Sequence, residues 1–295
     1  MELSTNVRDC ALVFEGGGYR AGYTAGMADV LLENDIYFPF VCGLSAGASN
    51  TVNYLSRDRW RTRWAFTELA GDPRAGGTRS VLRGNGYINA DYCYRGLIDQ
   101  GIAPFDWETF SHNPADLRIQ AFERDTGRTV TWGRKDIRTV HDLIDRVRAS
   151  STLPVLMKPI TVGGAVMLDG GLGKGAGLPL WMAEDAGYEK FLFLTTRERG
   201  YTKKPFVGGS RRVVMHTTEG YPLFRAAMLT RADRYNDEMR RIERLEQEGR
   251  CLIVRPDVME VESTTFDVER LEASFERGRE QALRELDRWL EFIGL

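Results

Sequence analysis

Short runs of apolar residues alternate along the chain with longer segments in which apolar residues recur every three to four positions. The short runs predict β-strands and the longer segments predict helices. The expected strands are Ala11–Glu15, Phe38–Cys42, Leu117–Glu123, Thr129–Trp132, Ile160–Val162, Ala165–Leu168, Phe191–Thr195 and Leu252–Val254. The expected helices are Arg20–Asn34, Ser45–Leu55, Val140–Ala149, Pro222–Glu248 and Asp267–Ile293. Strands that alternate with helices indicate an α/β fold with a mostly parallel sheet.

Turn-forming residues between neighbouring strands predict two β-hairpins. The sequence DTGR at 125–128 separates one pair of expected strands, and Gly163-Gly164 separates another. Residues 57–116 are mixed, with helical patches and a glycine-rich loop. No repeat or low-complexity linker divides the chain.

Charge and cysteine content exclude several classes of protein. The 295 residues include 40 Lys and Arg and 42 Asp and Glu, which gives a net charge of −2. Because acidic residues are interspersed with the basic ones, we expect no bulk electrostatic binding of nucleic acid. The four cysteines form no C-x-x-C pair, so we expect reduced thiols, with Cys42 buried in a strand, and no structural zinc site.

The N-terminal residues lack the basic start and apolar core of a signal peptide, and no run approaches the roughly 18 apolar residues of a membrane span. We therefore expect a cytoplasmic protein whose membrane contact, if any, is peripheral and at the inner membrane surface. Trp60 and Trp64 lie one helical turn apart among arginines, a spacing that suits an interfacial patch or, alternatively, two core residues with solvated arginines.

The strongest chemical signal is Gly43-Leu44-Ser45-Ala46-Gly47, between an expected strand and an expected helix. This is the context of a nucleophile elbow, in which a sharp turn projects the serine hydroxyl above the sheet. Gly43 and Gly47 allow the strand and helix to pass closely. The alternative is an ordinary glycine-flanked turn in which Ser45 caps the helix.

A second glycine cluster, Gly16-Gly17-Gly18, also joins a strand to a helix. Its backbone N–H groups could hold a dinucleotide pyrophosphate or the oxyanion of a tetrahedral acyl intermediate. A dinucleotide site needs an acidic residue at the end of the second strand. Ser45 follows that strand instead, which favours the oxyanion hole.

The serine requires a base, and the chain has only three histidines: His112, His141 and His216. His216 is the only late histidine that could complete a triad in the order Ser, acid, His. The other candidate is Asp169, at a strand end before Gly170 and Gly171, where a carboxylate could accept the serine proton. Asp169 could also be a simple turn residue.

Three ordered motifs resemble the patatin-like phospholipase family. They are G-G-G-x-R at 16–20, G-x-S-x-G at 43–47 and D-G-G at 169–171, and the segment ASSTLP at 149–154 is also similar to that family. The resemblance implies a three-layer α/β/α fold in which residues 10–205 form the catalytic domain. Residues 206–295 resemble the added segment of a bacterial subgroup, and we expect them to be mostly helical and packed on the catalytic domain.

The resemblance also implies a Ser-Asp dyad, with Ser45 as nucleophile and Asp169 as base, and needs no histidine, metal or cofactor. Gly16, Gly17, Gly18 and the N–H of Ala46 would form the oxyanion hole. Arg20 matches the family's arginine, which would orient the loop or assist the anion, although a plain salt bridge is an equal alternative. The chain has Ala21 where many members have glycine.

The implied activity is hydrolysis of acyl esters of lipids through an acyl-serine intermediate, as in a lipase or phospholipase A. Two alternatives stay open: acyl transfer by the same dyad to a lipid alcohol, and a non-catalytic lipid-binding or scaffold protein. The expected partner is a lipid or acyl-ester substrate.

Overall fold

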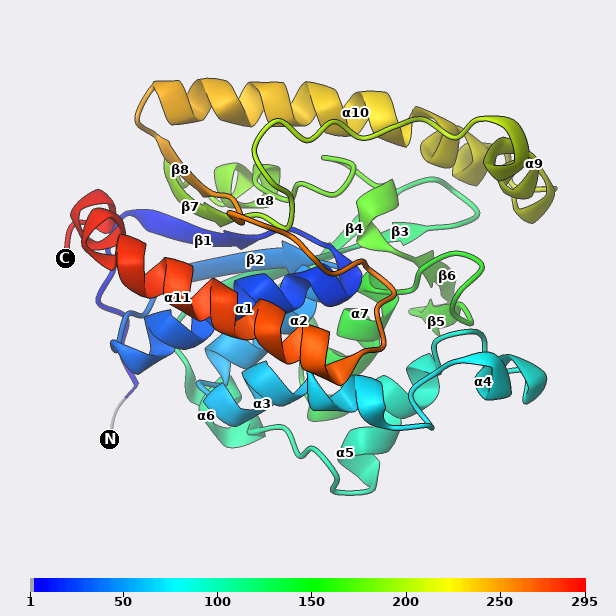
Figure 1. The fold of residues 1–295 in the computed structure, drawn as a ribbon, viewed down its shortest axis with the longest axis horizontal. Helices are drawn as coiled ribbons and strands as arrows, with labels where there is room; N and C mark the ends of the chain where they lie inside the picture. Colours follow the sequence, from blue (N-terminus) through cyan, green and yellow to red (C-terminus); the bar gives the residue numbers. More distant parts are fainter. Residues whose placement is uncertain (1–2) are drawn as a thin grey trace.

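One eight-stranded sheet forms the centre of the molecule in the computed structural model, which describes residues 3–295 (Figure 1). Its strand order is β5-β6-β3-β2-β1-β7-β8, with β4 paired to β3. The strands are β1 (Cys10–Phe14), β2 (Phe40–Leu44), β3 (Asp116–Glu123), β4 (Thr129–Trp132), β5 (Ile160–Val162), β6 (Ala165–Leu168), β7 (Lys190–Leu194) and β8 (Cys251–Val254).

Five neighbouring strands of the sheet are parallel, in the order β3, β2, β1, β7 and β8. The other three join through antiparallel pairs: β4 and β6 with β3, and β5 with β6. This arrangement confirms the expected α/β class with a mostly parallel sheet. Both predicted hairpins are present, and their strands β4, β5 and β6 have the expected bounds.

Helices cover both faces of the sheet and complete three layers (Figure 1). One face carries α1 (Ala21–Glu33), α2 (Ala46–Leu55), α7 (Val140–Ser150) and α11 (Val268–Ile293), and the other carries α8 (Trp181–Asp185) and α10 (Pro222–Gln247). Alternate residues of β1 point to opposite faces, as a strand requires. Leu12 and Phe14 pack with the first group of helices, and Ala11 and Val13 pack with the second.

Residues 57–116 form a set of short helices rather than one long element. They are α3 (Arg59–Trp64), η2 (Glu68–Gly71), α4 (Thr78–Leu82), the π-helical turn η3 (Asp91–Gly96), α5 (Leu97–Asp99) and α6 (Trp107–His112). Three further short 3₁₀ turns are η1 (Gly18–Arg20), η4 (Arg134–Asp136) and η5 (Gly170–Leu172). The remaining helix is α9 (Gly208–Thr217), which the sequence pattern did not predict.

The C-terminal residues are built into the same core as the rest of the chain. Strand β8 extends the sheet beside β7, and α11 packs along α1. The thiols of Cys10, Cys42 and Cys251 are buried, and all four cysteines are free, as expected. Within residues 3–295, no helix is both long and apolar enough to cross a membrane.

Candidate functional site

The register of the sheet brings the predicted site residues together at one end of its strands. Strands β1 and β2 are parallel neighbours with Phe14 opposite Gly43, so the glycine loop after β1 lies beside Ser45 after β2. Leu44 is opposite Gln120 of β3, and Leu168 of β6 pairs with the same strand. Asp169, directly after β6, therefore reaches the same cavity wall as Ser45.

Ser45 occupies a strained turn between β2 and α2. Its φ of 55° and ψ of −132° fall outside the regions that residues with a side chain usually adopt, at a cost on the order of 1–3 kcal/mol. The turn is held because its N–H donates to Ser150 Oγ at 2.8 Å, and that hydroxyl donates to the Gln120 carbonyl at 2.6 Å. The Ser45 side chain makes no helix-capping hydrogen bond, so the capping alternative is wrong.

Close backbone contacts explain the glycines of this turn. A Cβ on Gly47 would lie 2.5 Å from the Phe14 carbonyl oxygen, and one on Gly43 would meet the Gly47 carbonyl oxygen. A side chain at Gly47 would push α2 away from β1, and one at Gly43 would push α2 away from β2. The two glycines therefore allow the serine to lie directly at the end of β2, in the tight turn before α2.

The two oxygens of Asp169 have different roles. Oδ1 accepts a hydrogen bond of 2.8 Å from the Gly171 N–H, which is the turn role that the sequence allowed. Oδ2 is buried and has no hydrogen-bond partner among the described residues. The Asp169 N–H donates to the Thr152 carbonyl at 2.8 Å and fixes the residue in place. One oxygen thus positions the carboxylate and the other is free for chemistry.

Burial raises the pKa of Asp169, whose side chain is 2% exposed. Several neighbours oppose this effect: the positive charge of Arg231 first, then the Ser45 hydroxyl, the Gly171 N–H and Lys203. Ser45 is close enough to influence the pKa of the carboxyl, yet the pair does not meet the geometry of a hydrogen bond.

The glycine loop presents unoccupied backbone donors to the same cavity. The N–H groups of Gly17 and Gly18 donate to no backbone acceptor in the described chain, and both residues line the cavity beside Ser45. Thr196 Oγ1 donates to the Gly16 carbonyl at 2.9 Å and holds the loop against the end of β7. Ala46 begins α2, so its N–H also lies at a helix N-terminus.

Gly170 and Gly171 make room around Asp169. A Cβ on Gly170 would collide with the Gln120 carbonyl oxygen, and one on Gly171 would collide with the Arg231 guanidinium. These contacts bring β3 and α10 close to the carboxylate. Both glycines therefore allow close packing around Asp169.

Arg20 forms no ion pair within residues 3–295, so the salt-bridge alternative is not observed. Its Nε is buried without a hydrogen-bond partner. Burial first, and then the charge of Arg197, lower the pKa of Arg20 to about 10. An unpaired guanidinium next to the glycine loop is available to an anion.

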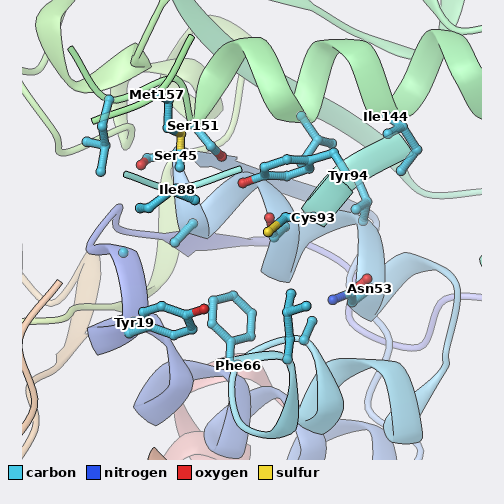
Figure 2. Close-up of a pocket in the computed structure, with 18 of the residues that line it drawn as sticks. Tyr19, Ser45, Asn53, Phe66, Ile88, Cys93, Tyr94, Ile144, Ser151 and Met157 are labelled. Atoms are coloured by element: carbon cyan, nitrogen blue, oxygen red, sulfur yellow. The ribbon is translucent and has the colours of Figure 1, made fainter. Parts of the chain in front are cut away.

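An apolar pocket opens from Ser45 (Figure 2). Tyr19, Phe66 and Ile88 line it together with residues from α2 and α7. Ser45 lies near Ser151 and Met157 at one side of the pocket, and Asn53 and Ile144 lie at the other (Figure 2). Such a pocket suits an apolar chain attached to a group that reacts at Ser45.

Other candidates are remote from this pocket. His112, His141 and His216 are all exposed, and none lines a cavity that contains Ser45. No group of three His, Cys, Asp or Glu side chains in residues 3–295 could hold a metal ion. Trp60 is 51% exposed and stacks on Trp64 with ring centroids 5.6 Å apart. Trp64 is partly buried against the apolar cluster that contains Leu69, so Trp60 lies at the surface and Trp64 at the edge of the core.

Several residues near Ser45 were not identified from the sequence as parts of the site. Ser150 fixes the Ser45 turn. Arg197, Lys203 and Arg231 line the cavity that contains Ser45, Asp169 and the glycine loop. Ser150 belongs to the ASSTLP segment, which offered a signal. Arg231 begins the segment RADRYN at 231–236, which resembles a bacterial subgroup of the family, whereas Arg197 and Lys203 carry no local motif. The three residues meet only through the tertiary fold.

Comparison with known proteins adds three findings. A family model described as patatin-like phospholipase matches residues 12–183, which is more than half of the chain. A domain of unknown function, DUF6363, matches residues 221–294. The crystal structure of VipD from Legionella pneumophila superposes with a TM-score of 0.51 at 13% sequence identity, covering 97% of this chain and 70% of that one. No curated protein sequence matches. The structural likeness shows the shared fold.

Proposed function

Because the chain belongs to the patatin-like phospholipase family, we propose that it is a serine acyl hydrolase that cleaves lipid esters with a Ser45–Asp169 dyad. The observation that carries this proposal is the free, buried Asp169 Oδ2 beside a strained serine that makes no capping bond. A helix cap or a turn alone would require neither feature.

In the first proposed step, Ser45 Oγ attacks the ester carbonyl carbon while its proton moves to Asp169 Oδ2. The carbonyl π electrons move to oxygen and form a tetrahedral oxyanion. The N–H groups of the Gly16–Gly18 loop and of Ala46 donate to that oxyanion, which is the largest electrostatic contribution in acyl transfer of this kind.

In the second step, the oxyanion collapses and the carbon–oxygen bond to the alcohol breaks. Asp169 returns its proton to the departing alcohol, which leaves an acyl-serine. Asp169 then takes a proton from water, whose oxygen attacks the acyl carbon. The second tetrahedral intermediate collapses, the bond from carbon to Ser45 Oγ breaks, and Asp169 gives the proton to Oγ, which frees the fatty acid and restores Ser45. These steps require no metal ion and no cofactor.

The dyad is tested with a fluorophosphonate probe, which reacts with activated serines, and with p-nitrophenyl acyl esters. We expect Ser45→Ala to lose labelling, and both Ser45→Ala and Asp169→Asn to lose at least about a thousandfold in kcat/KM, because either change removes the activated nucleophile. The exposed Ser111 and Asp185 provide matched controls, Ser111→Ala and Asp185→Asn, which should retain wild-type rates.

Circular dichroism establishes that each variant is folded. Full activity in either dyad variant would contradict the assignment, and absence of labelling in folded wild-type protein would favour a lipid-binding or scaffold role. Product analysis with added lysolipid or glycerol separates hydrolysis from acyl transfer, because only transfer forms a new ester.

A further inference from the structure

A second cavity, of about 400 Å³, also reaches Ser45. It shares Gly18, Leu153 and Ser263 with the apolar pocket, and the rest of its wall comes from other parts of the chain. Its wall includes the glycine loop, the segment between β7 and α9, and α10. Five basic side chains line it, from positions far apart in the sequence: Arg20, Arg197, Lys203, Lys204 and Arg231. The only carboxylates in this wall are Glu15 and Asp169.

None of these five basic groups forms an ion pair anywhere in residues 3–295, although arginines elsewhere do. Arg59 and Arg241, for example, pair with carboxylates at 2.7 Å and 2.8 Å. Glu15 and Asp169 supply two carboxylates against five basic side chains. The Glu15 oxygens accept hydrogen bonds from the Thr196 N–H and the Tyr235 hydroxyl at 2.6 Å and 2.7 Å, not from a basic side chain. The cavity therefore carries an uncompensated positive charge in a chain whose net charge is −2.

Arg20 and Lys203, both partly buried, are destabilised by this arrangement. The Arg20 Nε has no hydrogen-bond partner. Burial first, and then the charge of Arg231, lower the pKa of Lys203 to about 7. An anion in the cavity would offset both effects, because it supplies a partner for the guanidinium and favours the charged form of the lysine.

We propose that this cavity is a subsite for a phosphate group on the alcohol side of the ester, so that the protein prefers substrates whose leaving alcohol carries a phosphate monoester. The inference rests on the proposed function. With the carbonyl carbon at Ser45, the acyl chain occupies the apolar pocket and the alcohol extends among the basic side chains. Water cleaves the acyl–oxygen bond and yields a fatty acid and a phosphorylated alcohol.

The subsite also gives the C-terminal segment a part in substrate recognition. Arg231 on α10 contributes a guanidinium that can bind two phosphate oxygens at once, and Arg197 contributes a second. A choline head group would place its own positive charge beside this cluster. An uncharged glycerol would leave the cluster without an anion.

The test uses three esters with one acyl chain in common: 1-acylglycerol 3-phosphate, 1-acylglycerol and 1-acylglycerol 3-phosphocholine, each in non-ionic detergent micelles. Wild-type kcat/KM should be at least about tenfold higher for the phosphate monoester than for the other two, because only the monoester gives the basic side chains a dianionic group for charge-assisted hydrogen bonds. The readout is this ratio.

The double variant Arg197→Gln/Lys203→Gln should lower the ratio at least about tenfold. Two controls change charge elsewhere: Arg244→Gln, on the exposed side of α10, and Lys135→Gln in η4. Both should keep the wild-type ratio. High salt should also lower the wild-type ratio, because it screens charge.

Failure of the subsite and failure of the proposed function give different results. Normal probe labelling of Ser45 with equal rates for all three esters would overturn the subsite alone. Inhibition by inorganic phosphate, but not by glycerol 3-phosphate, with no preference among the esters would assign the cavity to free phosphate and likewise overturn it. Neither labelling nor hydrolysis by folded protein would overturn the proposed function itself.

Discussion

At the scale of single residues, the surroundings of Asp169 determine when it can act as a base. Burial favours its neutral form and raises its pKa, whereas the positive charge of Arg231 favours the ionised form. Only the ionised carboxylate can accept the Ser45 proton. Activity should therefore fall as the pH drops through the raised pKa of Asp169.

Arg231→Gln should move the acid limb of the pH–rate profile to higher pH. The reason is that removing the charge that most strongly lowers the pKa of Asp169 leaves burial less opposed. The measurement is kcat/KM for an uncharged p-nitrophenyl ester between pH 4 and 9. This range extends from the ordinary carboxyl pKa of about 4 to beyond neutral pH. Arg244→Gln, on the same helix, is the control.

An unchanged acid limb in Arg231→Gln would show that Asp169 does not carry the titration. A shift to lower pH would contradict the sign of the electrostatic argument. Because the ester is uncharged, the position of the limb reports the base rather than binding of an anionic substrate.

At the scale of elements, α1 and α11 are in backbone contact where they cross. A Cβ on Gly278 of α11 would collide with the Tyr23 carbonyl oxygen of α1, and one on Gly26 would collide with the Phe275 carbonyl oxygen of α11. The two glycines therefore set the distance between helices that are separated by most of the chain. No side chain can fit at either point without moving a helix.

Gly278→Ala should lower the free energy of unfolding by about 1–3 kcal/mol, the usual cost of overpacking. The expected loss exceeds the gain of up to about 1 kcal/mol that alanine brings to a helix. Gly209→Ala in α9 is the matched control, because nothing lies within 4 Å of its added Cβ. Urea denaturation measures both variants, and equal stability of Gly278→Ala and wild type would contradict the close contact.

The elements that the sequence predicted best are those with a strong local pattern. Strands β4, β5 and β6 lie next to clear turn residues, and α10 begins at Pro222 as expected. Helix α9 was missed because it is short, starts with two glycines and buries only Val214. Its sequence has no apolar face that would predict a helix.

The same distinction applies to the candidate site. Ser45, Asp169 and the glycine loop belong to short motifs, so they could be named from the sequence and their meeting is explained by strand register. Arg197 and Lys203 lie in no motif, and their side chains resemble those of any solvated surface. Arg231 begins the segment RADRYN at 231–236, which resembles a bacterial subgroup of the family but gave no indication of a site. Only the path of the chain after β7 and the position of α10 bring them to one cavity.

At the scale of the whole molecule, the C-terminal residues pack on both faces and on one edge strand of the sheet, and they do not form a separate unit. Strand β8 covers the edge of β7, α10 packs on one face and α11 on the other. Trp289 of α11 and Tyr235 of α10 are among the largest fully buried side chains. The two main apolar clusters both contain residues from this part of the chain.

A chain that ends at residue 205 should therefore lack cooperative unfolding, even though it keeps Ser45, Asp169 and the glycine loop. It would expose the hydrogen-bonding edge of β7 and the apolar surface that Trp289, Tyr235 and their neighbours cover. A chain that ends at Ile293 is the control, because Gly294 and Leu295 are exposed. Urea titration followed by circular dichroism should show a sharp transition in the control and a broad one in the shorter chain. A sharp transition in both would mean that residues 10–205 fold as an independent domain, and the role of the remainder would then be confined to the cavity that Arg231 lines.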